Sequence, residues 1–183
     1  IKQTLGELKV SNDKTTQLLL ENLNKAALDG LKTSIKLIES EMLRLVKQDD
    51  AVSANYNRMI TVPGIGKITA IFIICCTNNF AIKITGKQLA NYTGVVPHEH
   101  KSGTSVKGRN RVHFMANKEL KAILTMGALS AISAYPEFKD YYNRKINEGK
   151  KPLQVLNAIK NKMLLRVVAV INQQKNYENK YQS

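Results

Sequence analysis

Apolar side chains recur at helical spacing through the first third of the chain. The stretch from about residue 13 to residue 58 has no proline and a single glycine, Gly30, which predicts one long helix. Six apolar residues within it alternate in steps of three and four, the spacing of a coiled-coil seam: Leu28, Leu31, Ile35, Ile38, Met42 and Leu45. Asn24 and Asp49 share that register and limit the apolar repeat to about three heptads. We expect a helical arm, residues 1–58, that forms a homodimer through the seam; the alternative is an arm packed on its own domain.

Glycine, proline and asparagine divide the remaining chain, residues 59–183, into shorter helical patterns. The expected helices cover, in order, a segment through Cys76, the apolar piece QLANYTGVV, residues 118–134 capped by Asn117, a segment from Pro136 to Gly149, and a last segment from Pro152. The piece FAIKI could form one short strand, and the tail NYENKYQS resembles a frayed end. The predicted fold class is mainly α, with a long coiled-coil helix followed by a compact helical domain.

Residues 59–76 have the pattern of a helix-hairpin-helix, in which apolar residues flank the turn PGIG. Gly64 and Gly66 would let a tight turn present backbone amides at the start of the second helix, where the helix dipole attracts a phosphate. Lys67 adds a positive charge there. Such contacts bind nucleic acid without reading its sequence. The alternative is a corner between two helices with a purely structural role.

Charge is distributed unevenly between the two parts of the chain. The net charge is +14, but residues 1–58 hold 9 basic and 8 acidic side chains, and residues 59–183 hold 19 basic and 6 acidic ones. A basic domain beside a nearly neutral arm indicates a polyanionic partner, and no strongly apolar amphipathic face accompanies the charges. Nucleic acid is therefore favoured over a membrane.

The cysteines and histidines do not form a metal-finger pattern. Cys75 and Cys76 are adjacent in the apolar run AIFIICC, where an ordinary unstrained disulfide cannot form, so we expect buried thiols in a reducing cytoplasm. The three histidines are scattered: His98, His100 and His113. We find no signal peptide and no run of about twenty apolar residues. The chain begins without methionine, so we expect a fragment of a longer protein.

A serine-rich and basic loop, residues 95–116, carries the strongest candidate chemistry. Three hydroxyl residues surround one glycine in the order Ser102, Gly103, Thr104 and Ser105. Cations accompany them in the loop and at the start of the next helix: Lys101, Lys107, Arg109, Arg111, Lys118 and Lys121. A serine held on a glycine turn among cations could attack a phosphodiester once its proton is removed and the phosphoryl charge is neutralised. The alternative is an ordinary solvated basic loop.

Five sequence blocks occur in an order that is more specific than any one of them. They are VPGIGKITA, LANYTGVVP, HKSGTS, ANKELKAIL and YYNRKINEGKKPLQVLNAIKNKML. Together they resemble the C-terminal transposase domain of the insertion-sequence one-ten family, which includes the Piv-type DNA invertases. The resemblance covers roughly residues 59–172, and the helix before it is similar to the coiled-coil segment of that family.

The resemblance implies a DNA recombinase that acts through a phosphoserine intermediate, guided by a structured RNA. It implies Ser102 as the nucleophile, with Ser105 as a second candidate, and a RuvC-like N-terminal half whose four acidic residues bind Mg²⁺. The chain departs from the family at Ala116 and Lys121, where the family usually has Gly and Arg. Lysine lacks the bidentate fork of arginine, which puts a specific phosphate contact at Lys121 in doubt.

Acidic residues in the second part are too few and too scattered to form a two-metal cluster. They are Glu99, Glu119, Glu137, Asp140, Glu148 and Glu178. We therefore expect no metal in this chain and no DNA cleavage by it alone. Two other functions remain open: a non-catalytic nucleic-acid-binding module, and a coiled-coil scaffold with an incidentally basic end.

Overall fold

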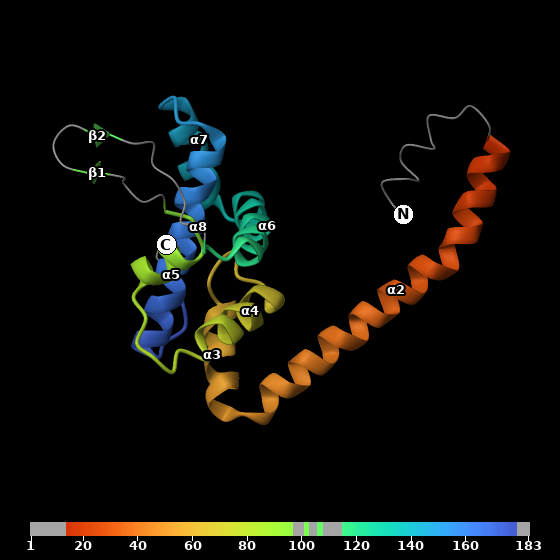
Figure 1. Cartoon of the computed structure of the whole chain (residues 1–183), viewed down its shortest axis with the longest axis horizontal. Coiled ribbons are helices and arrows are strands. Elements are labelled where there is room, and N and C mark those ends of the chain that lie inside the picture. The colour runs from red at the N-terminus through yellow and green to blue at the C-terminus, as the bar shows by residue number, and fades with distance from the viewer. Residues whose placement is uncertain (1–13, 97–100, 103–105, 108–114, 179–183) are drawn as a thin grey trace. The chain divides into compact units, whose positions relative to one another are not determined.

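The computed structural model describes residues 14–96, 101–102, 106–107 and 115–178 (Figure 1). The fold is mainly α and has a long N-terminal helix, as the sequence predicted. Its elements are α2 (Lys14–Gln48), α3 (Asp50–Ile60), α4 (Lys67–Thr77), α5 (Gly86–Tyr92), β1 (Lys101–Ser102), β2 (Val106–Lys107), α6 (Lys118–Ala134), α7 (Pro136–Asn147) and α8 (Pro152–Gln173). The chain divides into two compact units, Ile1–Leu45 and Val46–Ser183.

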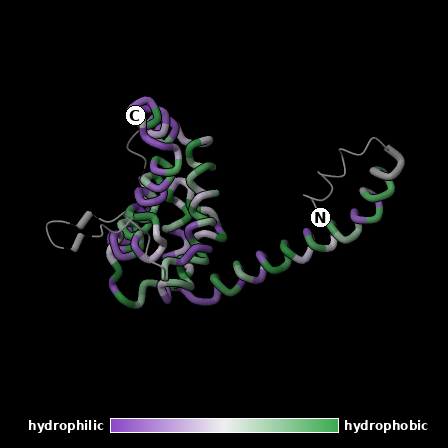
Figure 2. Tube along the Cα trace, turned by 45° about the horizontal axis from the view of Figure 1, so that its top comes forward, coloured by the Kyte–Doolittle hydropathy of each residue, from purple (hydrophilic) through white to green (hydrophobic). Residues whose placement is uncertain are grey.

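The expected single helix to residue 58 is two helices, because the chain turns at Asp49. The backbone of Asp49 is extended, and its carboxylate accepts a hydrogen bond from the N–H of Val52 at 3.0 Å, which caps α3. An aspartate side chain that binds a nearby backbone N–H competes with helix continuation. Along α2, Figure 2 shows apolar residues alternating with polar ones. Four seam residues are each more than half exposed: Leu31, Ile35, Ile38 and Leu45.

The core of the second unit forms around α8. This helix packs against α3, α5, α6 and α7, while α4 packs on α3 and α6. Apolar side chains at four-residue spacing give α8 a continuous buried stripe, and Ile159, Met163 and Val167 on it are fully buried. From α6, Leu120 and Leu124 are fully buried as well. The predicted N-cap of α6 is confirmed, since the side chain of Asn117 accepts from the N–H of Leu120.

A buried carboxylate joins α7 to α8. The carboxylate of Glu137 is 7% exposed and accepts hydrogen bonds from Arg166 and from the Nζ of Lys162. Burial acts to raise the pKa of Glu137, but the hydrogen bonds from the two cations outweigh it and lower that pKa. Glu137 therefore remains ionised inside the unit.

The segment after α8 is bound to the unit as far as the structure describes it. The backbone N–H of Tyr177 donates to Thr61 Oγ1 at 2.8 Å, and the guanidinium of Arg166 lies over the Tyr177 ring, 4.7 Å from its centroid. The expectation of a frayed tail is therefore wrong at residue 177. A tertiary hydrogen bond and a cation–π contact hold this position.

The expected strand in FAIKI is absent from residues 80–84, which all lie in the described part of the chain. Asn78, Asn79 and Phe80 adopt left-handed backbone angles, with φ of 46°, 53° and 59°. This run ends α4 and leads into a turn. A left-handed residue cannot continue into an extended strand.

The adjacent cysteines are not both buried, which corrects a second expectation. Cys75 is exposed and Cys76 is half-buried. On one face of α4, Ile68 and Cys75 are exposed and Phe72 between them is half-buried, whereas Ile71 and Ile74 face the core. An apolar run in sequence therefore covers both faces of this helix. None of the described helices is long and apolar enough to cross a membrane.

Candidate functional site

Ser102 lies in a short antiparallel hairpin within the basic loop. Lys101 pairs with Lys107, and Ser102 pairs with Val106 across the two strands. The hairpin thus brings two lysine backbones opposite each other immediately beside the serine. The other predicted loop residues lie outside the described residues: Gly103, Thr104, Ser105, Arg109 and Arg111. The choice between Ser102 and Ser105 as nucleophile therefore stays a prediction.

The two ends of the loop are held together at its base. The N–H of Asn117 donates to the carbonyl of Tyr92 at 2.8 Å, and Asn117 Nδ2 donates to the Tyr92 hydroxyl at 3.1 Å. Lys121 Nζ donates to the carbonyl of Gly94 at 2.8 Å. These bonds join the segment that enters the loop to the first turn of α6, which leaves the loop. A loop with a pinned base has a defined point of origin on the rigid helices.

A buried lysine that the sequence did not single out lies behind this base. Lys160 on α8 is 4% exposed, and its Nζ donates to Thr125 Oγ1 on α6 at 3.0 Å. Thr125 Oγ1 in turn donates to the carbonyl of Lys121 at 2.8 Å. Burial and the neighbouring charge of Lys121 lower the pKa of Lys160. Lysine is rarely buried without a carboxylate, so residue type alone would place Lys160 on the surface. The one sequence signal for its burial is its place next to Ile159 in the apolar stripe of α8.

The predicted turn of the helix-hairpin-helix packs closely on α6. Gly64 has a φ of +84°, and a Cβ placed on it would lie 2.9 Å from the carbonyl oxygen of Gly127 and 2.9 Å from Met163 Cε. A Cβ on Gly127 would in turn clash with the carbonyl oxygen of Gly64. Gly64 is therefore needed both for its left-handed backbone and for close packing. Gly66 differs, since a Cβ there meets nothing within 4 Å.

The predicted nucleic-acid-binding residues fall into two groups. Lys118 and Lys121 lie on the first turn of α6, at the base of the loop that carries Ser102. Gly66 and Lys67 are exposed at the start of α4. The turn before them packs at Gly127, six residues beyond Lys121 and hence about 9 Å further along α6. One helix thus supports both groups.

No three His, Cys, Asp or Glu side chains gather into a metal-binding group within the described ranges. The carboxylate that is best buried, Glu137, is occupied by two cations of the chain. Its site cannot also hold a metal without giving up those ion pairs. The described arrangement supplies cations, hydroxyls and backbone amides, which suit a phosphate group.

Comparison with known proteins identifies the family of this sequence. Residues 56–143 match the family model described as "Transposase IS116/IS110/IS902 family". The chain contains a transposase domain of this family. The matched residues of the transposase domain run from α3 into α7 and include the turn, the hairpin and α6. Lys160 lies beyond them.

Relatives of the transposase domain include proteins of two kinds. The Pilin gene-inverting protein of Moraxella bovis is 29% identical over 146 residues, which cover 79% of this chain and 45% of that protein. The Insertion element IS110 uncharacterized 43.6 kDa protein of Streptomyces coelicolor is 24% identical over 153 residues, covering 78% of this chain and 38% of that protein. The chain thus spans less than half the length of these relatives.

Proposed function

We propose that this chain is the serine-bearing, nucleic-acid-binding part of a DNA recombinase of an insertion sequence. The transposase domain supports a role in DNA recombination, since one of its relatives is named as a gene-inverting protein. The observation that carries the proposal is the hairpin register, in which Ser102 stands beside the Lys101–Lys107 pair. The bonds of Asn117 and Lys121 at the base of the loop support a fixed origin for the loop on the helices.

In the proposed reaction, the Ser102 oxygen attacks a DNA phosphodiester. A bond forms between the serine oxygen and phosphorus, and the bond from phosphorus to one nucleoside oxygen breaks. The serine proton passes to a base, and the leaving oxygen gains a proton. Cations of the loop neutralise charge on the phosphoryl oxygens. A second attack by a DNA hydroxyl on the phosphoserine reverses these bond changes and rejoins the DNA.

The remaining requirement is an activator for the serine, which is a weak nucleophile at neutral pH. We propose that an acidic, RuvC-like domain of the recombinase supplies it with bound Mg²⁺, because the described carboxylates form no metal site. Under this proposal the chain alone does not cleave DNA. A structured guide RNA and a homodimer formed through α2 are parts of the same proposal. The exposed seam of α2 supports the dimer.

The test uses the full-length recombinase on a nicked suicide substrate that traps the covalent intermediate. Ser102→Ala should abolish strand transfer and the DNA–peptide adduct while leaving DNA affinity unchanged. Ser105→Ala, a change of the same size in the same loop, should retain both. Mass spectrometry of the trapped peptide locates the modified serine. An adduct at Ser105 would move the nucleophile, and full strand transfer by Ser102→Ala would reject the mechanism in favour of a non-catalytic binding module.

A further inference from the structure

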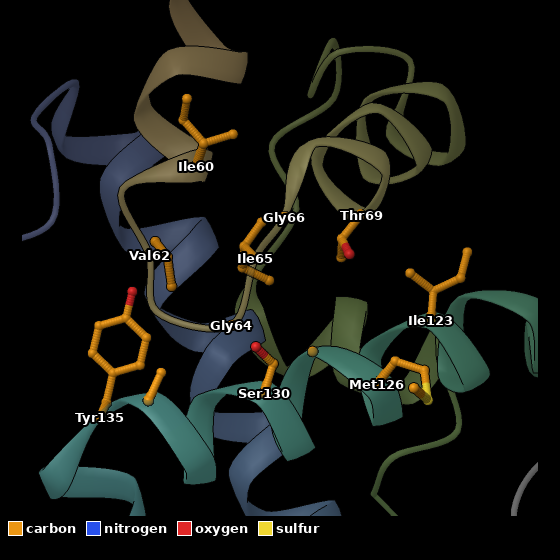
Figure 3. Close-up of a pocket in the computed structure, with 12 residues that line it drawn as sticks. Ile60, Val62, Gly64, Ile65, Gly66, Thr69, Ile123, Met126, Ser130 and Tyr135 are labelled. Carbon is orange, nitrogen blue, oxygen red and sulfur yellow. The ribbon is translucent and has the colours of Figure 1, made fainter. Parts of the chain in front are cut away.

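An open cleft of about 560 Å³ lies between the α3–α4 turn and α6 (Figure 3). The end of α3 and the turn form one wall, α6 and Tyr135 form the other, and Thr69 enters from α4. This volume lies within the range of about 300–1,000 Å³ that is typical of small-ligand sites. Gly64 and Gly127, which pack against each other, are both among its lining residues. None of its described lining residues belongs to the hairpin that bears Ser102.

The walls of this cleft are largely apolar, carry no charged side chain among the described residues and are partly open to solvent. Met126 is 68% exposed, Ile60 is 41% exposed and Tyr135 is 38% exposed, and all three line the cleft. Flat apolar surface of this kind suits the face of an aromatic ring. Neither an acidic nor a basic side chain is among the described residues that line it.

Thr69 and Ser130 supply hydroxyls on facing walls of the cleft. Thr69 is 6% exposed, and its hydroxyl has no hydrogen-bond partner among the described residues. In Figure 3 its oxygen points from α4 toward α6, where the Ser130 hydroxyl extends from the opposite wall. The Thr69 oxygen is not among the fully buried atoms that lack a partner, so it opens into the cleft, where it can bond a ligand in place of water. The occupant should therefore combine flat apolar faces with a polar edge.

Positive potential lies at the mouth of the cleft. Gly66 lines the cleft and is the N-cap of α4, and it provides no side-chain cap for the first-turn N–H groups. Those amides have no acceptor within the helix and favour an anion. Lys67, the first residue of α4, is exposed beside them. A phosphate is the anion that this arrangement suits, in keeping with the basic charge of residues 59–183.

We propose that this cleft binds one unpaired nucleobase of a nucleic-acid strand, with the adjoining phosphate at the start of α4. The face of the base lies against Met126, and its polar edge bonds the Thr69 and Ser130 hydroxyls. The base must be unpaired, because a base inside a duplex stack cannot present a free face and its edge to a protein cleft. This inference rests on the proposed function, since it specifies one form of the nucleic acid that the domain binds.

The test compares three fluorescent duplexes with the whole 183-residue chain. One is fully paired, one has a single bulged 2-aminopurine, and one has an abasic bulge of the same backbone. Wild type should bind the base bulge about tenfold more tightly than the abasic bulge, in line with the stacking of one base. Its 2-aminopurine fluorescence should change on binding. The abasic duplex separates recognition of the base from recognition of a bent backbone.

Variants connect that preference to the cleft. Met126→Ala and Thr69→Val should each bring the base-to-abasic ratio toward one without changing affinity for the paired duplex. Leu153→Ala is the control, because Leu153 is 74% exposed on α8 and does not line the cleft. Circular dichroism verifies that each variant is folded. Should Thr69→Val perturb the helix, Ser130→Trp, which fills the cleft from its exposed rim, provides the same readout.

The outcomes distinguish this inference from the proposed function. A wild-type ratio near one, or a ratio that the cleft variants leave unchanged, rejects the nucleobase site while binding of the paired duplex stands. Absence of binding to all three duplexes at low salt rejects the proposed function itself. A ratio near one together with weaker self-association of Ser130→Trp would show that the cleft docks protein, which also rejects the nucleobase site.

Discussion

Lys160 on α8 and Thr125 on α6 form a hydrogen bond from Nζ to Oγ1 at 3.0 Å, in a place where the lysine is 4% exposed. Neither Lys160 nor its cationic neighbour Lys121 pairs with a carboxylate among the described residues. A buried ammonium that is bound only by a neutral hydroxyl is poorly compensated for the water it has lost. Two predictions about stability follow from this relationship.

Replacing Lys160 by methionine should stabilise the domain. Methionine has a similar length and no charge, and Thr125 retains its bond to the carbonyl of Lys121. We expect the free energy of unfolding to rise by about 1–4 kcal/mol, the range for replacing buried charges by apolar groups. Lys162→Met on the same helix is the control, and it should lower stability because Lys162 pairs with Glu137. Urea unfolding measures both, and a destabilised Lys160→Met would show that the charge is compensated.

The benefit of Lys160→Met should shrink as pH rises. Burial and Lys121 lower the pKa of Lys160 in the folded state below its ordinary value of 10.5. Between the two pKa values the unfolded state binds more protons, so the free energy of unfolding of wild type rises with pH. Below the folded pKa the penalty of the buried charge is complete, and above 10.5 it is gone, because the lysine is then neutral in both states. Parallel urea titrations from about pH 7 to about pH 10 should show the two proteins converging; a constant gap would contradict the shift.

Gly127→Ala should destabilise the transposase domain. The new Cβ would clash with the carbonyl oxygen of Gly64 and lie 3.2 Å from Met163 Cε. Overpacking of this kind costs about 1–3 kcal/mol. Gly30→Ala is the matched control inside another helix, where a Cβ meets nothing within 4 Å, so it should not lower the thermal midpoint. Equal midpoints for Gly127→Ala and wild type would mean that the turn and α6 are further apart.

The exposed seam of α2 should mediate dimerisation. Ile35 and Ile38 are each more than half exposed, and lysines at these positions would place like charges across a dimer seam. Sedimentation at tens of micromolar protein detects dimers with dissociation constants in the micromolar range. It should show a dimer for wild type and a monomer for the double variant Ile35→Lys, Ile38→Lys. Lysines in place of Thr33 and Ser40, off the seam, add the same charge and should leave the dimer intact. A monomeric wild type would refute the coiled coil.

The basic loop should dominate the salt dependence of nucleic-acid binding. Changing four loop cations to alanine should flatten the slope of log K against log salt by about 3–4 units, at about 0.9 per phosphate contact on duplex DNA. The changed residues are Lys101, Lys107, Arg109 and Arg111. The control removes four exposed lysines elsewhere in the unit: Lys139, Lys150, Lys151 and Lys175. An equal effect of the two sets would place the binding surface outside the loop.

Local signals in the sequence were sufficient to predict most of the helices. Asn117 caps α6 at the residue expected, and Pro136 and Pro152 each begin a helix. Caps and prolines act through bonds and angles within a few residues, so the local sequence is enough to predict where these helices begin. The sequence analysis missed the turn at Asp49 because it interpreted this aspartate as a polar residue in the seam of one continuous helix. The carboxylate instead caps a new helix, α3.

Only the tertiary structure decided which residues meet across helices. Ser102 and the cations near it already form a cluster in the sequence. The hairpin that contains Ser102 is also local, since it pairs segments only a few residues apart. Lys160 reaches Thr125 from 35 residues away, and Gly64 meets Gly127 across an even longer separation. Both glycines line the cleft that Thr69 shares with Ser130. Helical periodicity specifies the buried face of each helix, but the partner that covers a face depends on packing among all of them at once.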